Sequence, residues 1–285
     1  MSGCGGGWGR AGASGGERAL PRLKPRLGGL SLKRRLGDEL EEEFEPTAYA
    51  AWFASPLGRL VWADERRALT QVLGEAGGRL ILDAGAGDGR WAAELASEGA
   101  RVVAIDASRS MAAAAKERIR GERRVYLVVG DAARLPFPPG CFDAATAVTL
   151  LCFVEHPRVV MAELGRVTRP GGTVVLGELG RWSLWAAIRR IRVLVRAGPW
   201  AGARFWTVRD LRALLRDAGL EPVLRAAAVF YPPSVLAAKI LRPIERLLGR
   251  MSGVGAAFVA VAGRKRPAGR EAREPGLLGA GVPYA

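Results

Sequence analysis

The sequence predicts an α/β domain in which helices cover both faces of a mostly parallel β-sheet. Short apolar runs of strand length alternate with segments of helical character through residues 80–177. Such alternation is typical of parallel strands joined by right-handed crossovers. A glycine-rich loop follows the first run, and an acid closes each of the first three. With 285 residues, 49% of them hydrophobic, the chain can form one large domain with additions.

The first strand is expected at residues 80–83, and a helix is expected at residues 90–96. The loop between them contains the small residues Gly85, Ala86, Gly87 and Gly89. Glycines permit a sharp turn with positive φ and leave bare peptide against which a ligand can lie. A dinucleotide-binding turn would need its third glycine where this chain has Arg90. The spacing therefore disfavours a nicotinamide or flavin cofactor.

Two more strands are expected at residues 101–106 and 125–129. Asp106 follows Gly85 by 106 − 85 = 21 residues, the interval at which an acid binds ribose hydroxyls in nucleotide-binding folds. The third strand leads directly into Gly-Asp-Ala, with the acid at Asp131. Each acid alone is equally typical of a helix cap or a turn. Together with the glycine loop, the three acids predict a cofactor site.

These residues resemble the class I S-adenosylmethionine-dependent methyltransferases. Asp83 and the three glycines resemble motif I, and residues 130–137 resemble the family's G-D-A-x-x-L-P-F stretch. The resemblance implies S-adenosylmethionine as the cofactor, with Asp83 balancing its cationic groups, Asp106 on the ribose and Asp131 on the adenine amino group. The cofactor-binding residues that it implies are Asp83, Gly85, Ala86, Gly87, Gly89, Asp106, Ala107, Met111, Asp131, Ala132 and Thr149.

The resemblance covers about residues 47–263 and implies a Rossmann-like three-layer sandwich. Its seven-stranded, mostly parallel sheet has the strand order 3-2-1-4-5-7-6, with the seventh strand antiparallel. The later strands are expected at residues 142–148, 173–177, 223–229 and 256–262. An Arg-Pro-Gly-Gly turn at residues 169–172 is expected to lead into the fifth strand.

The segment before the first strand resembles the N-terminal motif Y-x-x-W-F-x-x-P-x-G of one branch of this family, the methyltransferases of type 11 related to quinone-biosynthesis enzymes. In that branch an N-terminal helix folds over the cofactor. Tyr49, Trp52 and Phe53 are therefore expected in a helical lid that excludes water. Packing of an extra helix onto the core would produce the same pattern, and both roles can hold together.

Two inserted cap helices are expected at about residues 182–206 and 232–250. The apolar face of the first comprises Leu184, Ile188, Ile191 and Val195. We expect these helices to pack on the core with solvated arginines, above the carboxyl ends of the strands where substrate caps are inserted. Peripheral contact with a membrane surface is the alternative.

The net charge of +15 is concentrated at the ends of the chain. Residues 1–36 carry +7 and residues 264–285 carry +3, and we expect both to be disordered tails that flank one domain at residues 37–263. Such tails can bind nucleic acid or an acidic membrane, although we favour plain solvation. The N-terminus lacks the pattern of a secretory signal, and no apolar window is long enough to span a bilayer. We therefore expect a cytoplasmic protein.

The cysteine and histidine content argues against a metal site and against a disulfide framework. Cys4, Cys141 and Cys152 show no C-x-x-C spacing, and the chain has one histidine. The (D/N)-P-P-(Y/F) motif of DNA amino-methylation is missing after the fourth strand, and Cys152 lacks the preceding proline of RNA cytosine methylation. These features predict a small-molecule acceptor and no specific nucleic acid. They leave the oligomeric state open.

The predicted function is methyl transfer from S-adenosylmethionine to a small lipophilic or aromatic acceptor. Glu155 and His156 follow the fourth strand and are candidates for a general base, but they are equally typical of the turn before the next helix, which we favour. One alternative function is a nicotinamide-dependent oxidoreductase, which Arg90 disfavours. The other is a non-catalytic cofactor-binding protein tethered through its basic ends.

Overall fold

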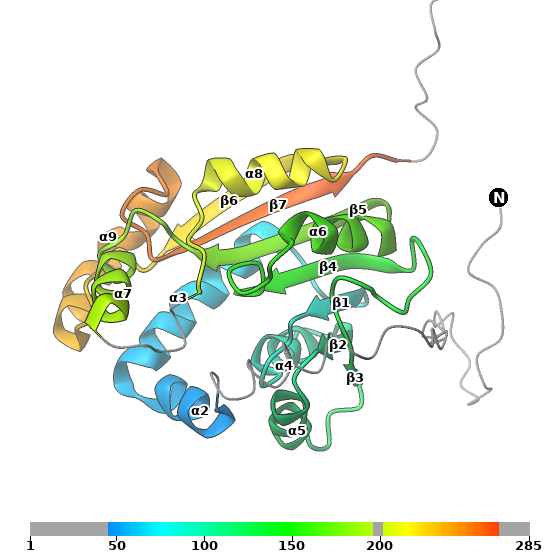
Figure 1. Cartoon of the computed structure of the whole chain (residues 1–285), viewed down its shortest axis with the longest axis horizontal. Coiled ribbons are helices and arrows are strands. Elements are labelled where there is room, and N and C mark those ends of the chain that lie inside the picture. Colours follow the sequence, from blue (N-terminus) through cyan, green and yellow to red (C-terminus); the bar gives the residue numbers. More distant parts are fainter. Residues whose placement is uncertain (1–44, 196–201, 268–285) are drawn as a thin grey trace, which may run out of the picture.

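A computed structural model of the chain describes residues 45–195 and 202–267 (Figure 1). The strands are β1 (Leu80–Ala84), β2 (Arg101–Asp106), β3 (Val125–Val129), β4 (Phe142–Val148), β5 (Thr168–Leu179), β6 (Leu220–Ala228) and β7 (Phe258–Lys265). The described helices are α2 (Pro46–Ala54), α3 (Pro56–Leu73), α4 (Arg90–Ser97), α5 (Arg109–Arg118), α6 (Pro157–Val167), α7 (Leu184–Val195), α8 (Val208–Asp217) and α9 (Val235–Met251). The predicted tail at residues 1–36 and most of the C-terminal tail lie outside the described residues.

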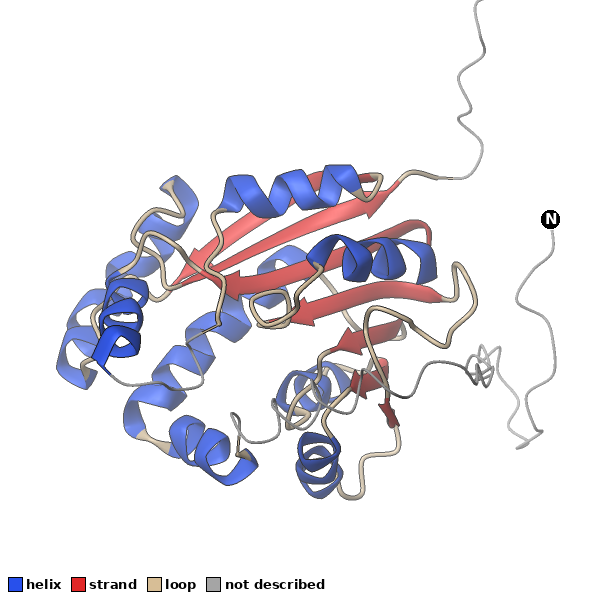
Figure 2. Ribbon diagram, viewed as in Figure 1, coloured by secondary structure: helices blue, strands red, loops and turns tan. Residues whose placement is uncertain are grey.

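The strands form one sheet in the order β3-β2-β1-β4-β5-β7-β6 (Figure 2). Neighbouring strands from β3 to β5 pair in parallel, and β7 runs antiparallel to both β5 and β6. The expected strand order and the antiparallel seventh strand are confirmed.

Helices cover both faces of the sheet and create two apolar cores. Leu80 and Leu82 of β1 pack with residues of α6 and α8, whereas Ile81 packs with residues of α3 and α4 on the opposite face. This alternation follows from the two-residue period of a strand. Because both faces are covered, the central strands are mostly apolar, and the three-layer architecture is confirmed.

The N-terminal helices α2 and α3 meet at a sharp corner specified by Ser55, Pro56 and Gly58. The Ser55 hydroxyl accepts a hydrogen bond from the Gly58 N–H at 3.0 Å and donates to the Trp52 carbonyl at 2.6 Å. Pro56 occupies the first turn of α3, where no N–H is needed. A Cβ at Gly58 would lie 2.0 Å from the Trp52 oxygen. Only glycine therefore permits this close approach.

The strands on the β6 side differ from their expected bounds. β5 begins at Thr168, so the Arg-Pro-Gly-Gly segment lies inside the strand, and the pairing with β4 is irregular between Phe142 and Ala144. β6 begins and β7 ends outside the expected limits, because Leu220 pairs with Lys265. Lys265, expected in the tail, donates through Nζ to the carbonyls of Gly165 and Thr168 at 2.7 and 2.8 Å.

Both segments in which we expected caps contain a helix, α7 and α9, but the face of α7 that we expected to be buried is wrong. Trp185 and Ala186 are buried, whereas Leu184 and Ile191 are 53% and 61% exposed. The Trp185 Nε1–H donates to the Tyr231 carbonyl at 2.7 Å, and this hydrogen bond fixes the rotation of α7 about its axis. Among the described residues, no helix has the length and apolar composition that a bilayer span requires.

A buried polar cluster joins cap helix α9 to α3. Asp64 is 1% exposed and accepts hydrogen bonds from the Tyr231 hydroxyl at 3.0 Å and from the Arg242 Nε at 3.0 Å. Glu245, also buried, accepts from Arg67 at 3.2 Å. Burial and the nearby Asp64 carboxylate raise the pKa of Glu245. These contacts attach the cap to the helix that precedes β1.

We expect Asp64→Ala to lower the free energy of unfolding by about 2–3 kcal/mol, because the buried Tyr231 hydroxyl and the half-exposed Arg242 guanidinium both lose their acceptor. Tyr231→Phe should cost about 1 kcal/mol, since it removes one hydrogen bond while Arg242 remains paired. Urea denaturation measures both values. Arg66→Ala, which removes an exposed pair with Glu94, is the control and should change stability by less than about 1 kcal/mol. Equal losses in all three variants would contradict the assigned role of Asp64.

Candidate functional site

The candidate site lies at the carboxyl ends of β1, β2 and β4, where the strand order reverses. β1 pairs with β2 on one side and with β4 on the other. From β1 the chain adds β2 and β3 toward one edge of the sheet, and it then returns to add β4 and β5 toward the other edge. In open α/β sheets, ligands bind in the crevice at such a switch point. The loops that carry the predicted site residues begin at this edge of the sheet.

The loop between β1 and α4 is anchored at its base and open at its tip. The N–H groups of Gly85 and Ala86 both donate to the Ile105 carbonyl, at 2.8 and 3.1 Å. Gly85 and Gly87 have φ values of 70° and 54°, which favour glycine. A Cβ at Gly85 would lie 2.7 Å from the Leu150 side chain, whereas one at Gly87 would meet nothing within 4 Å. The peptide at Gly87 therefore faces open space, as a ligand-binding loop requires.

The carboxylate of Asp106 joins this loop to the end of β2. Its Oδ2 accepts a hydrogen bond from the Gly87 N–H at 2.8 Å, and its Oδ1 accepts from the Ser108 N–H at 2.9 Å. Burial raises the pKa of Asp106, and these backbone donors oppose that shift. Each carboxylate oxygen has a further lone pair. Asp106 can therefore hold the loop and still accept hydrogen bonds from a ligand.

Asp83, the predicted partner of a cation, is 1% exposed at the end of β1. Its Oδ1 accepts a hydrogen bond from the Thr146 hydroxyl at 2.9 Å, and its Oδ2 has no hydrogen-bond partner within the described part of the chain. Burial raises the pKa of Asp83 to about 7, and the charge of Asp106 adds to the effect. A buried carboxylate with an unused oxygen is suited to binding a cationic group.

The remaining predicted residues follow β2 and β3 at the same edge. Met111 is buried in the first turn of α5, where the Ser108 side chain caps the helix, and Ala107 is exposed beside it. Asp131 accepts a hydrogen bond from the Ala133 N–H at 2.8 Å, and Ala132 is buried. The Gly130 N–H donates to the Asp106 carbonyl at 2.8 Å. This hydrogen bond brings the loop after β3 next to the acid after β2.

Thr149, at the end of β4, begins a turn that a buried acid supports. Its φ of 49° is unusual for a threonine. The carboxylate of Glu178 in β5 accepts a hydrogen bond from the Leu151 N–H at 2.6 Å, and burial raises its pKa to about 8. Our sequence analysis missed Glu178, although a glutamate within an otherwise apolar central strand is a recognisable signal.

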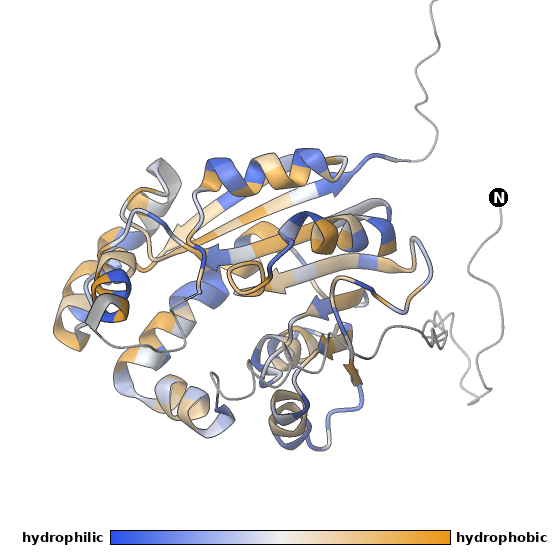
Figure 3. Cartoon of the chain, in the orientation of Figure 1, coloured by the Kyte–Doolittle hydropathy of each residue, from blue (hydrophilic) through white to orange (hydrophobic). Residues whose placement is uncertain are grey.

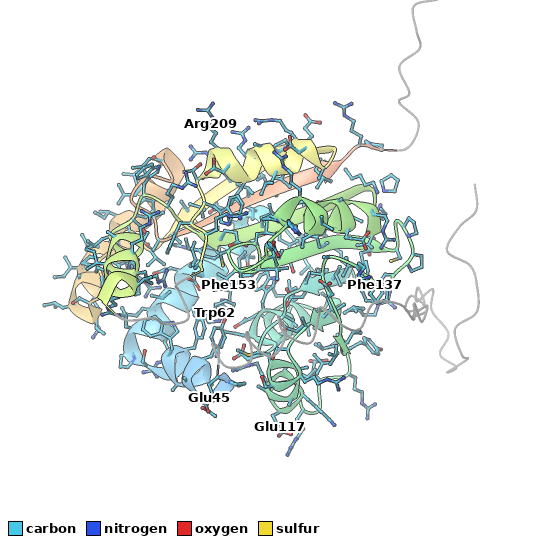
Figure 4. The ribbon with its side chains drawn as sticks, viewed as in Figure 1. Glu45, Trp62, Glu117, Phe137, Phe153 and Arg209 are labelled. Atoms are coloured by element: carbon cyan, nitrogen blue, oxygen red, sulfur yellow. The ribbon has the colours of Figure 1, made fainter. Side chains whose placement is uncertain are left out.

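Arg90, the first residue of α4, connects the glycine loop to helices α2 and α3. Its guanidinium pairs with Asp88 at 3.1 Å and lies 4.3 Å from the centre of the Phe53 ring. Phe53 in turn packs edge-on against Tyr49 and against Trp62, which Figure 4 labels. The predicted lid residues Tyr49 and Phe53 thus gather beside the start of α4. Cation–π contacts of this kind tie the lid to the loop.

The charges of Glu65 on α3 and Arg189 on α7 influence one another, and our sequence analysis did not identify either as a site residue. Burial raises the pKa of Glu65 to about 8, and the charge of Arg189 opposes the shift. Burial raises the pKa of Tyr49 as well, and the charges of Asp88 and Glu65 add to that effect. These groups therefore share one poorly solvated region. Trp185, 6.0 Å from the ring of Trp52, lies on the same helix as Arg189.

Glu155 and His156, the candidate general bases, lie in the segment that opens α6. Their side chains are 73% and 72% exposed and 3.7 Å apart, and His156 is the N-cap residue of α6. This placement agrees with the turn that we favoured. Within the described ranges, no group of three histidine, cysteine, aspartate or glutamate side chains is arranged to hold a metal ion.

Known proteins resemble this chain in sequence and in structure. A methyltransferase-domain family matches residues 82–176. A demethylmenaquinone methyltransferase of Parafrankia sp. is 35% identical over 190 residues, which cover 57% of this chain and 74% of that protein. An uncharacterised protein of Mycobacterium tuberculosis is 34% identical over 194 residues, 67% of this chain and 64% of that protein, so the chain spans less than two thirds of that relative.

A solved structure gives the same assignment. A SAM-dependent methyltransferase of Thermotoga maritima superimposes with a TM-score of 0.63 and 25% sequence identity, covering 80% of this chain and 99% of that one. The sheet order, the glycine loop and the acids at the carboxyl ends of β1 and β2 agree with this similarity. The chain belongs to the class I S-adenosylmethionine-dependent methyltransferases, in the branch that resembles the quinone methyltransferases, and S-adenosylmethionine is its cofactor.

Proposed function

We propose that this protein transfers a methyl group from S-adenosylmethionine to a small lipophilic or aromatic acceptor. The observation that carries the proposal is the unused Oδ2 of the buried Asp83 carboxylate, next to the loop whose peptide at Gly87 faces open space. A buried charge without a partner is unfavourable in the free protein. This combination fits a cationic ligand that lies against bare peptide and whose hydroxyl groups donate hydrogen bonds to a carboxylate such as Asp106.

Each part of the cofactor has a matching group in the chain. Asp83 would bind the ammonium group, Asp106 the ribose hydroxyls, and the bare peptide of Gly87 would contact the middle of the molecule. Met111 and Ala132, both buried, would flank the adenine, and Asp131 would accept a hydrogen bond from its amino group. When bound, the cofactor supplies a methyl group already activated by a positively charged sulfur. The protein then mainly has to align the acceptor and exclude water.

Aromatic rings in the lid and the cap support a lipophilic acceptor. The rings form two edge-to-face groups. Tyr49 and Phe53 of α2 pack with Trp62 of α3, and Trp52 of α2 packs with Trp185 of α7. Such rings contribute large apolar surfaces with fixed geometry. The Parafrankia relative is named for demethylmenaquinone, a name that agrees with an acceptor of this kind.

We further propose that Glu65 accepts the proton released by the acceptor. Its pKa of about 8 makes the carboxylate a stronger base than an ordinary glutamate, and the ionised fraction that can accept a proton grows as the pH rises through about 8. The proton passes from the acceptor's hydroxyl group or ring carbon to a Glu65 oxygen as the new bond to the methyl carbon forms. The electron pair of the broken carbon–sulfur bond stays on sulfur. Arg189, whose charge influences Glu65, would stabilise the negative charge that develops on the acceptor.

Asp83→Asn should weaken S-adenosylmethionine binding by about 10- to 100-fold, since a hydrogen bond to a charged group is worth about 1.5–3 kcal/mol. The effect also has a pH signature. Asp83 is protonated in the free protein below about pH 7, and a bound cation lowers its pKa, so wild-type affinity should rise with pH up to about 7 and then level off. Asp83→Asn should lose this dependence.

Isothermal titration at several pH values measures the effect of Asp83→Asn. Asp217→Asn, which changes a surface carboxylate paired with Arg158, is the matched control and should bind as the wild type does. Wild-type affinity in Asp83→Asn at pH 8 would disprove the proposed role of Asp83.

The glycine loop allows a comparison of two substitutions with similar backbone strain. Gly87→Ala should bind S-adenosylmethionine at least about tenfold more weakly, because the new methyl group occupies the open space where the ligand would lie, and should cost about 1 kcal/mol of stability for its positive φ. Gly85→Ala should destabilise the protein more, since its Cβ would collide with Leu150. Melting temperatures and titrations of both variants test this. A larger loss of stability in Gly87→Ala would contradict the assigned open side of the loop.

Glu65→Gln should lower kcat by at least about 100-fold with demethylmenaquinol as the probe acceptor, while its affinity for S-adenosylmethionine stays as in the wild type. The wild-type kcat should rise with pH through about 8 as the Glu65 carboxyl loses its proton, and the variant should lack this rise. Glu65→Asp should restore part of the rate, and Glu117→Gln, at an exposed position, is the control. Activity in Glu65→Gln with an unchanged pH profile would rule out Glu65 as the base.

A further inference from the structure

The exposed apolar residues of the described chain are concentrated on and around the two cap helices. Figure 3 shows long hydrophobic stretches on α9 at the left edge of the molecule, beside α7. Eight of the thirteen large hydrophobic side chains that are exposed in the described part of the chain belong to this region. They form what we call the cap surface: Trp182, Leu184, Ile191, Leu236, Ile240, Ile244, Leu247 and Val254.

The apolar stripe of α9 is not in contact with the core because the opposite side of the helix is already packed. Leu236, Ile240, Ile244 and Leu247 recur at intervals of four, four and three residues and therefore share one face, with 49–68% exposure. The other face is fixed by the buried polar cluster with α3 and by Gly249, where a Cβ would lie 2.4 Å from the Ala227 carbonyl.

α7 adds to the same surface for a related reason. Its inward side carries Trp185, hydrogen-bonded to Tyr231, and Arg189, whose pKa is lowered by burial. Leu184 and Ile191 consequently face outward. The Gly255 N–H also donates to the Trp182 carbonyl at 2.7 Å. This contact joins the segment before α7 to the segment after α9.

The charges of the cap surface have one sign. α7 contains three arginines and no acid, and α9 contains four basic residues and one acid, Glu245. Glu245 is fully buried against Arg67, so neither helix presents an acid to solvent. Arg190, Arg192 and Lys239 are exposed beside the apolar residues. Two copies of this surface facing each other would bring like charges together, which disfavours a second copy of the chain as the occupant.

We propose that the cap surface binds the surface of an anionic lipid bilayer, with the stripe of α9 inserted among the headgroups. A helix with an apolar face bordered by lysine and arginine is the usual element of such contact, and each basic residue near an anionic surface adds to the attraction. Contact at this position would place the cap helices, which stand over the carboxyl ends of the strands, next to the phase in which lipophilic molecules dissolve. The proposal concerns lipid binding and does not require that methyl transfer be correct.

Vesicle co-sedimentation of the full chain tests the proposal. The probes are vesicles of equal parts phosphatidylcholine and phosphatidylglycerol, vesicles of phosphatidylcholine alone, and a series at about 0.5 M salt, where the Debye length is about 4 Å. The wild type should bind the anionic vesicles and keep part of that binding in high salt. Ile240→Ser/Ile244→Ser should reduce partitioning by at least about tenfold. Tyr126→Ser/Val159→Ser, at exposed apolar positions on β3 and α6, should bind like the wild type.

Insertion depth gives a second measurement. Brominated phospholipids should quench the fluorescence of Trp182, which is 60% exposed, and Trp182→Phe should show less quenching than the wild type. Circular dichroism of Ile240→Ser/Ile244→Ser should match the wild type, because both side chains are already exposed.

Three results would overturn the proposal. The first is a wild type that fails to bind the anionic vesicles. The second is a double serine variant that binds as well as the wild type, which would assign the binding to the basic ends of the chain. The third is a wild-type dimer in light scattering that becomes a monomer in the double serine variant.

Discussion

The hydrogen bonds that Asp106 accepts from the Gly87 and Ser108 N–H groups are the contacts on which the site depends. They connect the loops that follow two neighbouring strands, and hydrogen bonds to a charged acceptor are stronger than neutral ones. Asp106 Oδ2 holds the glycine loop in its positive-φ conformation, and Oδ1 fixes the turn at Ser108, the N-cap residue of α5. With its N–H directed at Asp106, the loop leaves the other side of the Gly87 peptide open.

Buried acids give the site its electrostatic character. Glu178 is supported by the backbone N–H of Leu151 and orders the turn after β4, so its burial serves the structure. Asp83 and Glu65 are poorly solvated, and burial raises the pKa of each; they are the two acids that we propose to meet ligand groups. Perturbed pKa values that cluster at one cleft are typical of functional sites. The free energy that burial costs at Asp83 would be recovered when a cation binds beside it.

The cap helices reverse the usual distribution of polar and apolar residues. α7 half-buries Arg189 and leaves Leu184 and Ile191 outside. α9 buries Glu245, whereas Leu236, Ile240, Ile244 and Leu247 face solvent. The buried Glu245 serves the attachment of α9 to α3, through its hydrogen bond from Arg67. The rotation of α7 about its axis brings the charge of Arg189 near that of Glu65. The same rotation turns Leu184 and Ile191 of the cap surface toward solvent.

The sequence by itself determined the central strands β1 to β4, the glycine loop and its acids. The first three strands are apolar runs that end at an Asp or a Gly, and the site residues lie at or just after the strand ends. The bounds of β6 and β7 depended on pairing between distant segments, such as Leu220 with Lys265. The rotation of α7 depended on the hydrogen bond from Trp185 to Tyr231, which a helical pattern cannot indicate. Glu65 and Arg189 are 189 − 65 = 124 residues apart, and only the packing of lid and cap brings them together. Local periodicity encodes the elements and their loops, whereas contacts between remote side chains exist only once the chain has folded.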